Sequence, residues 1–298
     1  MAQQSITEAL RPGLREWFEF HVGTGHDLAD VKAALVAAGY RAEDVEGFLR
    51  EESARFAKSQ QGGLFDAEPV DSQAEAADRF WRRLDVLAPF NRVLLVDRVV
   101  PILVKHFGSG IFFLPEFLSD EECAGLIAQA DGRMEDSKVF DQRKGERVVD
   151  PSRSSRSGVI RRGDGELARR IESRIAKLTD LPVALGENLQ IVHYTAGGEY
   201  VPHFDFFDPE TPAGAEALTG NSQRLLTVIM YLSDVDGGGW TQFPDLKVEF
   251  TPTRGAALLF PSLDRQRSPL RPSLHWGRPV ISGEKWIATK WIRLSPQA

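Results

Sequence analysis

The residues best suited to chemistry are a histidine and an aspartate two positions apart, His203 and Asp205, in a segment rich in aromatic and β-branched residues. In an extended strand, side chains at positions i and i+2 lie on the same side, so this imidazole and this carboxylate can converge on one point. Both groups are common ligands of divalent metal ions. A His-x-Asp triplet alone occurs by chance in roughly one chain in four of this composition, so a metal site needs a third ligand and a suitable context.

The third ligand that we expect is His275, in a later strand-rich segment of a chain with six histidines. A single histidine is more often a hydrogen-bonded structural residue than a ligand, so its neighbours must decide. Two histidines and one carboxylate on one side of an ion leave three coordination positions open, which is the arrangement of non-haem Fe(II) oxygenases. Lys285 follows across a turn and can place an ammonium group in the same cavity to hold an anionic cosubstrate. An isolated lysine here would instead be a solvated strand residue.

Composition limits what else the chain can be. Its 298 residues are 42% hydrophobic and 27% charged, which is typical of a folded globular protein. Cys123 is the single cysteine, so an intrachain disulfide, a thiolate cluster and an iron–sulfur site are excluded, and any metal must be held by His, Asp and Glu. The net charge of −7 gives no reason to expect nucleic acid or an anionic membrane as a partner. No secretory signal or membrane span is evident, so we predict a cytoplasmic location.

The elements that must position these residues fall into two parts. Apolar residues recur at helical spacing in residues 1–57, and Gly23 and Gly39 separate the runs, which predicts a small three-helix bundle. Residues 58–77 are polar and are predicted to be a linker. The catalytic domain is then expected over residues 78–298. The bundle is either a separate module or a part of the catalytic core.

The second part is predicted to be helical at first and then rich in strands. Ser119 followed by Glu122 is the start signal of a helix. After Leu189, short runs of β-branched and aromatic residues alternate with turn clusters such as DVDGGG and TPTRG. Many short strands after helices predict an α+β fold in which helices pack on a jelly roll, and such folds commonly hold ligands between their two sheets.

Six sequence blocks occur in a fixed order: YTAGGEYVPHFD, RLLTVIMYLSD, GGWTQFP, GAALLF, then His275 and Lys285. Together they resemble the prolyl 4-hydroxylase family of 2-oxoglutarate and Fe(II)-dependent dioxygenases, of the bacterial type with an N-terminal helical extension. The resemblance covers roughly residues 112–293. It implies a double-stranded β-helix, the cupin-like jelly roll, with supporting helices. Several ordered blocks are a much stronger signal than one triplet.

The resemblance also implies roles for single residues. His203, Asp205 and His275 would be the iron ligands, and Lys285 would pair with the distal carboxylate of 2-oxoglutarate. Tyr194 and Thr241 would donate hydrogen bonds to the same cosubstrate, although Thr241 is equally well explained as a strand threonine satisfied by the backbone. Fe(II), 2-oxoglutarate, dioxygen and ascorbate are the cofactors and cosubstrates that the family resemblance implies.

For the reaction, the resemblance implies hydroxylation of a peptidyl proline at C4, with release of succinate and carbon dioxide. Tyr200, Arg224 and Trp291 occupy positions where members of this family contact the peptide. Tyr200 and Trp291 are equally well explained as aromatic residues packed in the core. Arg224 is equally well explained as a surface residue. The polar segment 140–158 is either a lid over the iron or an ordinary surface loop.

Two alternatives to a peptidyl-proline hydroxylase remain open. The chain can be a related dioxygenase that hydroxylates a free amino acid or another small molecule. It can also be an adaptor, in which the N-terminal helices bind a protein. The filled metal positions argue against an inert scaffold.

Overall fold

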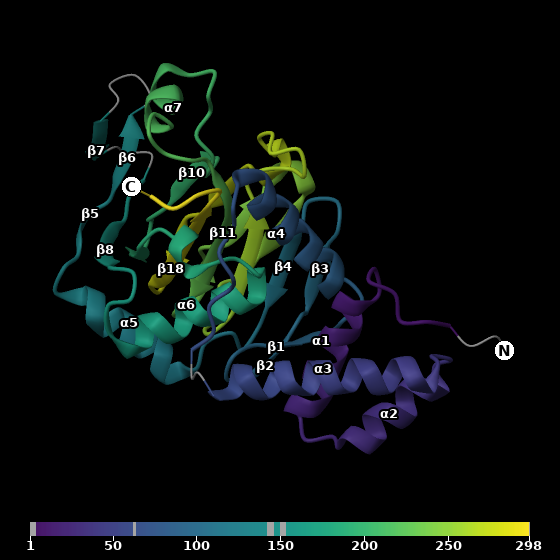
Figure 1. Ribbon diagram of the computed structural model, residues 1–298. Helices are drawn as coiled ribbons and strands as arrows, with labels where there is room; N and C mark the ends of the chain where they lie inside the picture. Colours follow the sequence, from purple (N-terminus) through teal and green to yellow (C-terminus); the bar gives the residue numbers. More distant parts are fainter. Residues whose placement is uncertain (1–3, 62–63, 142–145, 150–152, 298) are drawn as a thin grey trace.

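The computed structural model describes residues 4–61, 64–141, 146–149 and 153–297. The chain begins with three helices, α1 (Arg11–Gly23), α2 (Leu28–Ala37) and α3 (Ala42–Gln61), which pack together at the edge of the molecule (Figure 1). Their shared apolar core is separate from the cores of the rest of the chain. The predicted three-helix bundle is therefore present.

The connection after the bundle is shorter than expected. We predicted a linker over residues 58–77, but α3 runs to Gln61 and α4 begins at Gln73. The side chain of Ser72 caps α4 by accepting a hydrogen bond from the backbone N–H of Glu75 at 3.1 Å. This Ser-x-x-Glu start signal lies within a stretch whose polar composition indicates a linker. Here the capping signal predicts the local structure better than the composition does. Helix α4 therefore begins inside the predicted linker, and the division into domains stays a prediction.

The remaining connection is attached to the catalytic domain. Ser173 donates a hydrogen bond to the carbonyl of Phe65 at 2.6 Å, and the carboxylate of Asp66 accepts one from the backbone N–H of Val183 at 2.7 Å. Ala67 is buried. The residues just before α4 therefore lie against the catalytic domain.

The bundle contacts the catalytic domain through charged pairs. Glu16 and Glu19 on α1 accept hydrogen bonds from Arg83 and Lys177, each at 2.6 Å. Gly23 at the end of α1 lies against Leu94. Thus α1 is the helix that joins the bundle to the rest of the fold.

The catalytic domain is built on two antiparallel sheets. The larger has eight strands in the order β3-β4-β15-β11-β18-β9-β8-β5. In that order, its strands are Val104–His106, Ile111–Leu114, Ala257–Pro261, Arg224–Tyr231, Lys285–Arg293, Leu189–Tyr194, Arg156–Ile160 and Glu135–Asp136. The smaller sheet has four strands in the order β10-β16-β13-β14. They are Tyr200–His203, His275–Gly277, Thr241–Phe243 and Val248–Phe250.

Shorter elements complete the domain. Three two-stranded sheets pair β1 (Arg92–Leu94) with β2 (Val99–Pro101), β6 (Lys138–Asp141) with β7 (Glu146–Val149), and β12 (Gly237–Gly238) with β17 (Val280–Ser282). The last α-helix in the described part of the chain is α7 (Pro212–Ala217), and the 3-10 helices η2 (Pro244–Leu246) and η3 (Arg271–Ser273) follow it. Of the segment 140–158, residues 142–145 and 150–152 lie outside the described residues, so the lid stays a prediction.

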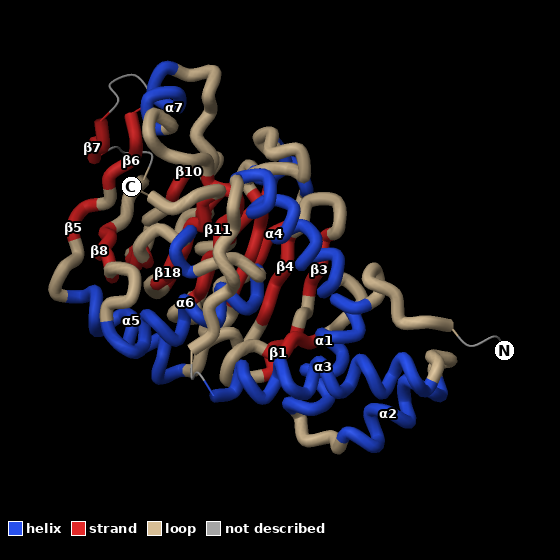
Figure 2. The backbone as a smooth tube through the Cα atoms, in the orientation of Figure 1, coloured by secondary structure: helices blue, strands red, loops and turns tan. Residues whose placement is uncertain are grey.

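Each face of the large sheet covers a different core. Helices α4 (Gln73–Leu87), α5 (Asp120–Asp131) and α6 (Gly165–Thr179) lie along one face, as Figure 2 shows, and form the larger apolar core with it. The opposite face turns toward the small sheet and forms a second core. Helix α5 begins with the predicted capping box of Ser119 and Glu122. The α+β jelly roll with supporting helices is confirmed.

Within the described parts of the chain, no helix combines the length and the apolar character needed to cross a membrane. The cytoplasmic location stays a prediction.

Candidate active site

The predicted metal ligands meet between the two sheets. Strands β10 and β16 pair so that His203 lies opposite His275, and Asp205 follows directly after β10. Nε2 of each histidine is 3.8 Å from a carboxylate oxygen of Asp205. One ligand atom from each residue lies within 4.8 Å of the others. One ion at about 2.1 Å from each ligand can bridge such a set after a small closure.

Hydrogen bonds from outside the triad orient all three ligands. Nδ1 of His203 donates to the carbonyl of Val201 at 2.8 Å, and Nδ1 of His275 donates to that of Ser273 at 3.0 Å. Each histidine therefore presents its Nε2 lone pair to the metal position. The hydroxyl of Thr227 donates to Oδ2 of Asp205 at 2.6 Å and fixes that carboxylate.

The electrostatics keep His203 and Asp205 in their ligating forms. Burial, together with the neighbouring His275, lowers the pKa of His203 to about 3, so its imidazole is neutral at pH 7. Burial opposes ionisation of Asp205, but the interactions with His275, His203 and Arg224 outweigh it and lower the pKa of that carboxyl to about 2. Two imidazoles and one carboxylate form the donor set of an Fe(II) site with open positions, and the residues present fit that ion.

The predicted cosubstrate residues line the same interior. Tyr194 on β9 pairs directly with Lys285 at the start of β18, and Nζ of Lys285 is 5.4 Å from the centre of the tyrosine ring. The lysine is only 2% exposed, and burial lowers its pKa to about 7. No carboxylate among the described side chains forms an ion pair with it. A buried ammonium without an anion is a site for one.

Thr241 lies on β13 of the small sheet. It is buried, and its hydroxyl accepts a hydrogen bond from the hydroxyl of Tyr231 at 2.8 Å. Its own proton can then be donated to a ligand. The hydroxyl of Thr241 thus has a side-chain partner, and its role toward the cosubstrate stays a prediction.

Two of the predicted substrate residues, Tyr200 and Arg224, contact the triad, and the third, Trp291, packs against Arg224. Tyr200 stacks on His203 with ring centres 3.5 Å apart, and burial raises the pKa of its hydroxyl to about 12. Arg224 lies 3.9 Å over the ring of Trp291 and donates through Nε and Nη2 to Glu187 at 2.7 and 2.9 Å. Arg224 is thus neither a surface residue nor unpaired.

Sequence reasoning missed several residues of this site. Arg153 lies 4.8 Å over the ring of Tyr200 and is only 9% exposed. Glu187 binds both Arg224 and Arg293, the latter at 2.8 Å, and Thr227 holds Asp205. Each comes from a strand or loop distant in the sequence, where residue type and spacing carry no sign of the contact.

The comparisons with known proteins agree with this geometry. Residues 189–293 match the family model described as the 2OG-Fe(II) oxygenase superfamily. The chain is 35% identical over 217 residues to prolyl 4-hydroxylase 2 of Arabidopsis thaliana, and the match covers 65% of this chain and 71% of that protein. The chain belongs to the prolyl 4-hydroxylase family of 2-oxoglutarate and Fe(II)-dependent dioxygenases. The predicted family is confirmed, and Fe(II), 2-oxoglutarate and dioxygen are the metal and cosubstrates of this family.

Other relatives are more distant or are matched over less of their length. The chain is 31% identical over 202 residues to prolyl 4-hydroxylase subunit alpha-1 of Caenorhabditis elegans, with 68% of this chain and 36% of that protein covered. Among solved structures, the viral collagen prolyl hydroxylase of Paramecium bursaria Chlorella virus-1 in complex with 2-oxoglutarate is 29% identical, with a TM-score of 0.49 and coverage of 61% of this chain and 95% of that one. The chain spans about two thirds of the Arabidopsis relatives, from 62% of one to 71% of another.

Proposed function

We propose that the protein hydroxylates C4 of a proline within a polypeptide, using Fe(II), 2-oxoglutarate and dioxygen and releasing succinate and carbon dioxide. The observation that carries the proposal is the placement of the His203, Asp205 and His275 triad and the buried Lys285 in one interior between the two sheets. The relatives named as prolyl 4-hydroxylases support the choice of proline.

The chain's own residues would hold and orient the reactants. The triad binds the iron, which supplies the oxidative chemistry when present. Lys285 pairs with the distal carboxylate of 2-oxoglutarate, and the hydroxyls of Tyr194 and Thr241 donate to its remaining oxygens. The surrounding apolar core keeps bulk water away and strengthens these interactions.

The substrate would enter from the side of Tyr200. An aromatic ring stacked on an iron ligand offers a flat apolar wall that suits a pyrrolidine ring. Arg224 and Trp291 form a second wall, which the ion pair with Glu187 holds in place. Ascorbate would serve to return oxidised iron to Fe(II).

The direct test is product analysis. The protein is incubated with Fe(II), 2-oxoglutarate, ascorbate and proline-containing peptides, and the products are searched by mass for an added oxygen that fragment ions place on proline. Methionine oxidation gives the same mass change, so localisation is required. We expect 4-hydroxyproline and one succinate for each hydroxylated residue. Hydroxylation of free amino acids but of no peptide would instead establish a small-molecule dioxygenase.

A further inference from the structure

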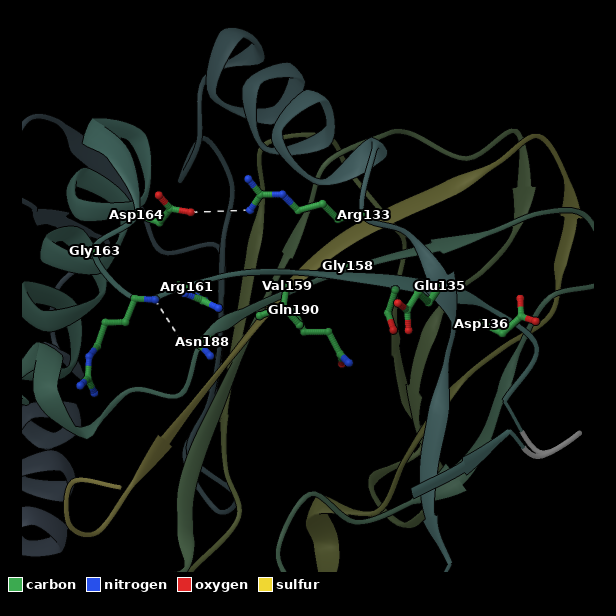
Figure 3. A pocket seen from close by; sticks show the side chains of 12 residues that line it. Arg133, Glu135, Asp136, Gly158, Val159, Arg161, Gly163, Asp164, Asn188 and Gln190 are labelled. Carbon is green, nitrogen blue, oxygen red and sulfur yellow. Dashed lines mark hydrogen bonds and ion pairs between the residues drawn. The ribbon is translucent and has the colours of Figure 1, made fainter. Parts of the chain in front are cut away.

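The large sheet extends beyond the small one. Strands β9, β8 and β5 are the last three in the order of the large sheet, and their inner face lines a polar cavity of about 940 Å³. Alternation along β8 places Ser157 and Val159 on this face, and Val159 pairs with Gln190 of β9. Figure 3 shows Val159 and Gln190 together in the middle of the cavity. We call this surface the β8 groove.

Side-chain contacts connect the β8 groove to the active site. Gln190 accepts a hydrogen bond from Nη2 of Arg153 at 3.1 Å. Arg153 lies over Tyr200, which stacks on His203. Gln190 and Tyr194 lie on the same face of β9, four residues and so about 13 Å apart. One line of contacts therefore runs from the groove to the metal ligands.

The charges in the β8 groove are of two kinds. Some are already occupied: Arg133 pairs with Asp164 at 3.7 Å, and Arg162 donates to the carbonyls of Ala184 and Gly186 at 2.7 and 3.2 Å.

Other charged side chains of the groove have no such partner among the described residues. Arg161 at one end and Glu135 on the edge strand at the other are on opposite sides of Val159 in Figure 3 and form no side-chain ion pair or hydrogen bond with the residues that the structure describes. Val159 between them is 46% exposed, a large fraction for a valine in a strand. The groove thus offers a cation, an apolar contact and an anion in sequence.

We propose that the β8 groove binds the segment of the polypeptide substrate that flanks the target proline, in extended form, with an acidic side chain at Arg161 and a basic side chain at Glu135. The inference rests on the proposed function for the choice of polypeptide. Gln190 in the groove lies about 13 Å along β9 from Tyr194 in the active site, a distance that a peptide crosses in about four residues and a free amino acid does not span. Complementary charges at both ends set the orientation and register of such a segment.

The test is a charge reversal read by binding. Two fluorescent peptides carry one central proline and either Glu or Lys about four residues to each side of it. Their affinity for the enzyme with Fe(II) and 2-oxoglutarate is measured without oxygen, so that no turnover occurs. For Arg161→Glu, we expect binding of the Glu peptide to weaken about fivefold and binding of the Lys peptide to strengthen, and for Glu135→Lys the opposite change. Arg82→Glu, an exposed arginine of α4, is the matched control.

The outcomes separate this inference from the proposed function. The groove is supported if Arg161→Glu shifts the binding preference toward the Lys peptide and Glu135→Lys shifts it toward the Glu peptide, while Arg82→Glu leaves the affinities unchanged. Equal affinities of both peptides for the wild type and all variants, or no binding of either peptide, would overturn it. If charge-selective binding occurs but no proline is hydroxylated when oxygen is admitted, the proposed function fails while the groove stands. If proline is hydroxylated without charge selectivity, the groove fails alone.

Discussion

At the scale of single residues, Lys285 links burial to cosubstrate binding. Its pKa is lowered to about 7 because the ammonium is buried. Since 2-oxoglutarate pairs with the charged form, binding requires an added proton whenever the pH lies above that pKa. The Kd for 2-oxoglutarate should therefore be nearly constant below pH 6.5 and rise about tenfold per pH unit above pH 7.5.

Calorimetric titration with Mn(II) in place of Fe(II) measures this dependence without turnover. Lys285→Arg is the matched variant, because a guanidinium stays charged throughout the range. We expect its 2-oxoglutarate binding to be weaker at low pH but flat across the titration. A flat profile in the wild type would show that Lys285 is not the group that titrates.

Removal of the Lys285 charge should weaken cosubstrate binding strongly. Lys285→Ala leaves the distal carboxylate of 2-oxoglutarate in a buried site without a cation, a loss of about 3–5 kcal/mol. We expect the KM for 2-oxoglutarate to rise by two orders of magnitude or more, with partial recovery in Lys285→Arg, since the guanidinium differs in shape. Steady-state succinate release measures this, and an unchanged KM in Lys285→Ala would remove the residue from the site.

The triad variants test the metal site directly. His203→Ala, Asp205→Ala and His275→Ala should each abolish turnover of 2-oxoglutarate while the far-ultraviolet circular dichroism stays that of the wild type. Thr227→Val should keep the fold but lower metal affinity about 10- to 100-fold, because the hydrogen bond that fixes Asp205 is lost. His106→Ala is the control, because His106 is a histidine on β3 that does not belong to the triad. Near wild-type activity in any triad variant would exclude that residue as a ligand.

At the scale of elements, sequence pattern predicts what is local and misses what depends on register. The His203 and Asp205 spacing, the capping box at Ser119 and the strand-rich character after Leu189 are local, and the structure contains all of them. The pairing of His203 opposite His275 depends on how β10 meets β16, which no single strand encodes. The family resemblance supplied His275 as a ligand together with His203 and Asp205, but not the strand pairing that brings them together.

Residues that support the site were beyond sequence reasoning for the same reason. Thr227 reaches Asp205 from the large sheet, and Glu187 joins Arg224 to Arg293 from a loop before β9. Nothing in their neighbours distinguishes them from ordinary strand and loop residues. The linker prediction differs from the structure for another reason. Ser72 and Glu75 carry a helix start signal, but the prediction relied on the polar composition of the stretch.

The cap of α4 is a test at this scale. Ser72→Ala removes the side-chain acceptor for the N–H of Glu75, which should lower the free energy of unfolding by about 1 kcal/mol. In a chain of this size, a loss of that magnitude lowers Tm by about 2–4 °C. Thermal unfolding followed by circular dichroism measures the change. An unaltered Tm would mean that α4 is held by its packing alone, with Ala76 and Phe80 in the core.

At the scale of the whole molecule, the question is whether the bundle is a separate module of residues 1–57. Its apolar core shares no residue with the two cores of the catalytic domain, which favours independence. Its contacts through Glu16 and Glu19 are charged, and water can replace them when the bundle is absent. Residues 65–67, by contrast, lie against the catalytic domain and must be kept.

A truncated chain that begins at residue 64 should therefore fold and still convert 2-oxoglutarate to succinate, because every proposed site residue lies beyond α4. Activity on a short proline peptide should survive, while activity on a folded protein substrate should fall if the bundle docks that protein and raises its effective concentration. Arg83→Gln with Lys177→Gln in the full chain is the matched comparison, since it removes the charged contacts and keeps the bundle. Aggregation of the truncated chain would show that α1 covers an apolar surface the catalytic domain needs buried. Loss of succinate release in a truncated chain that stays folded would show that the bundle supports the active site itself.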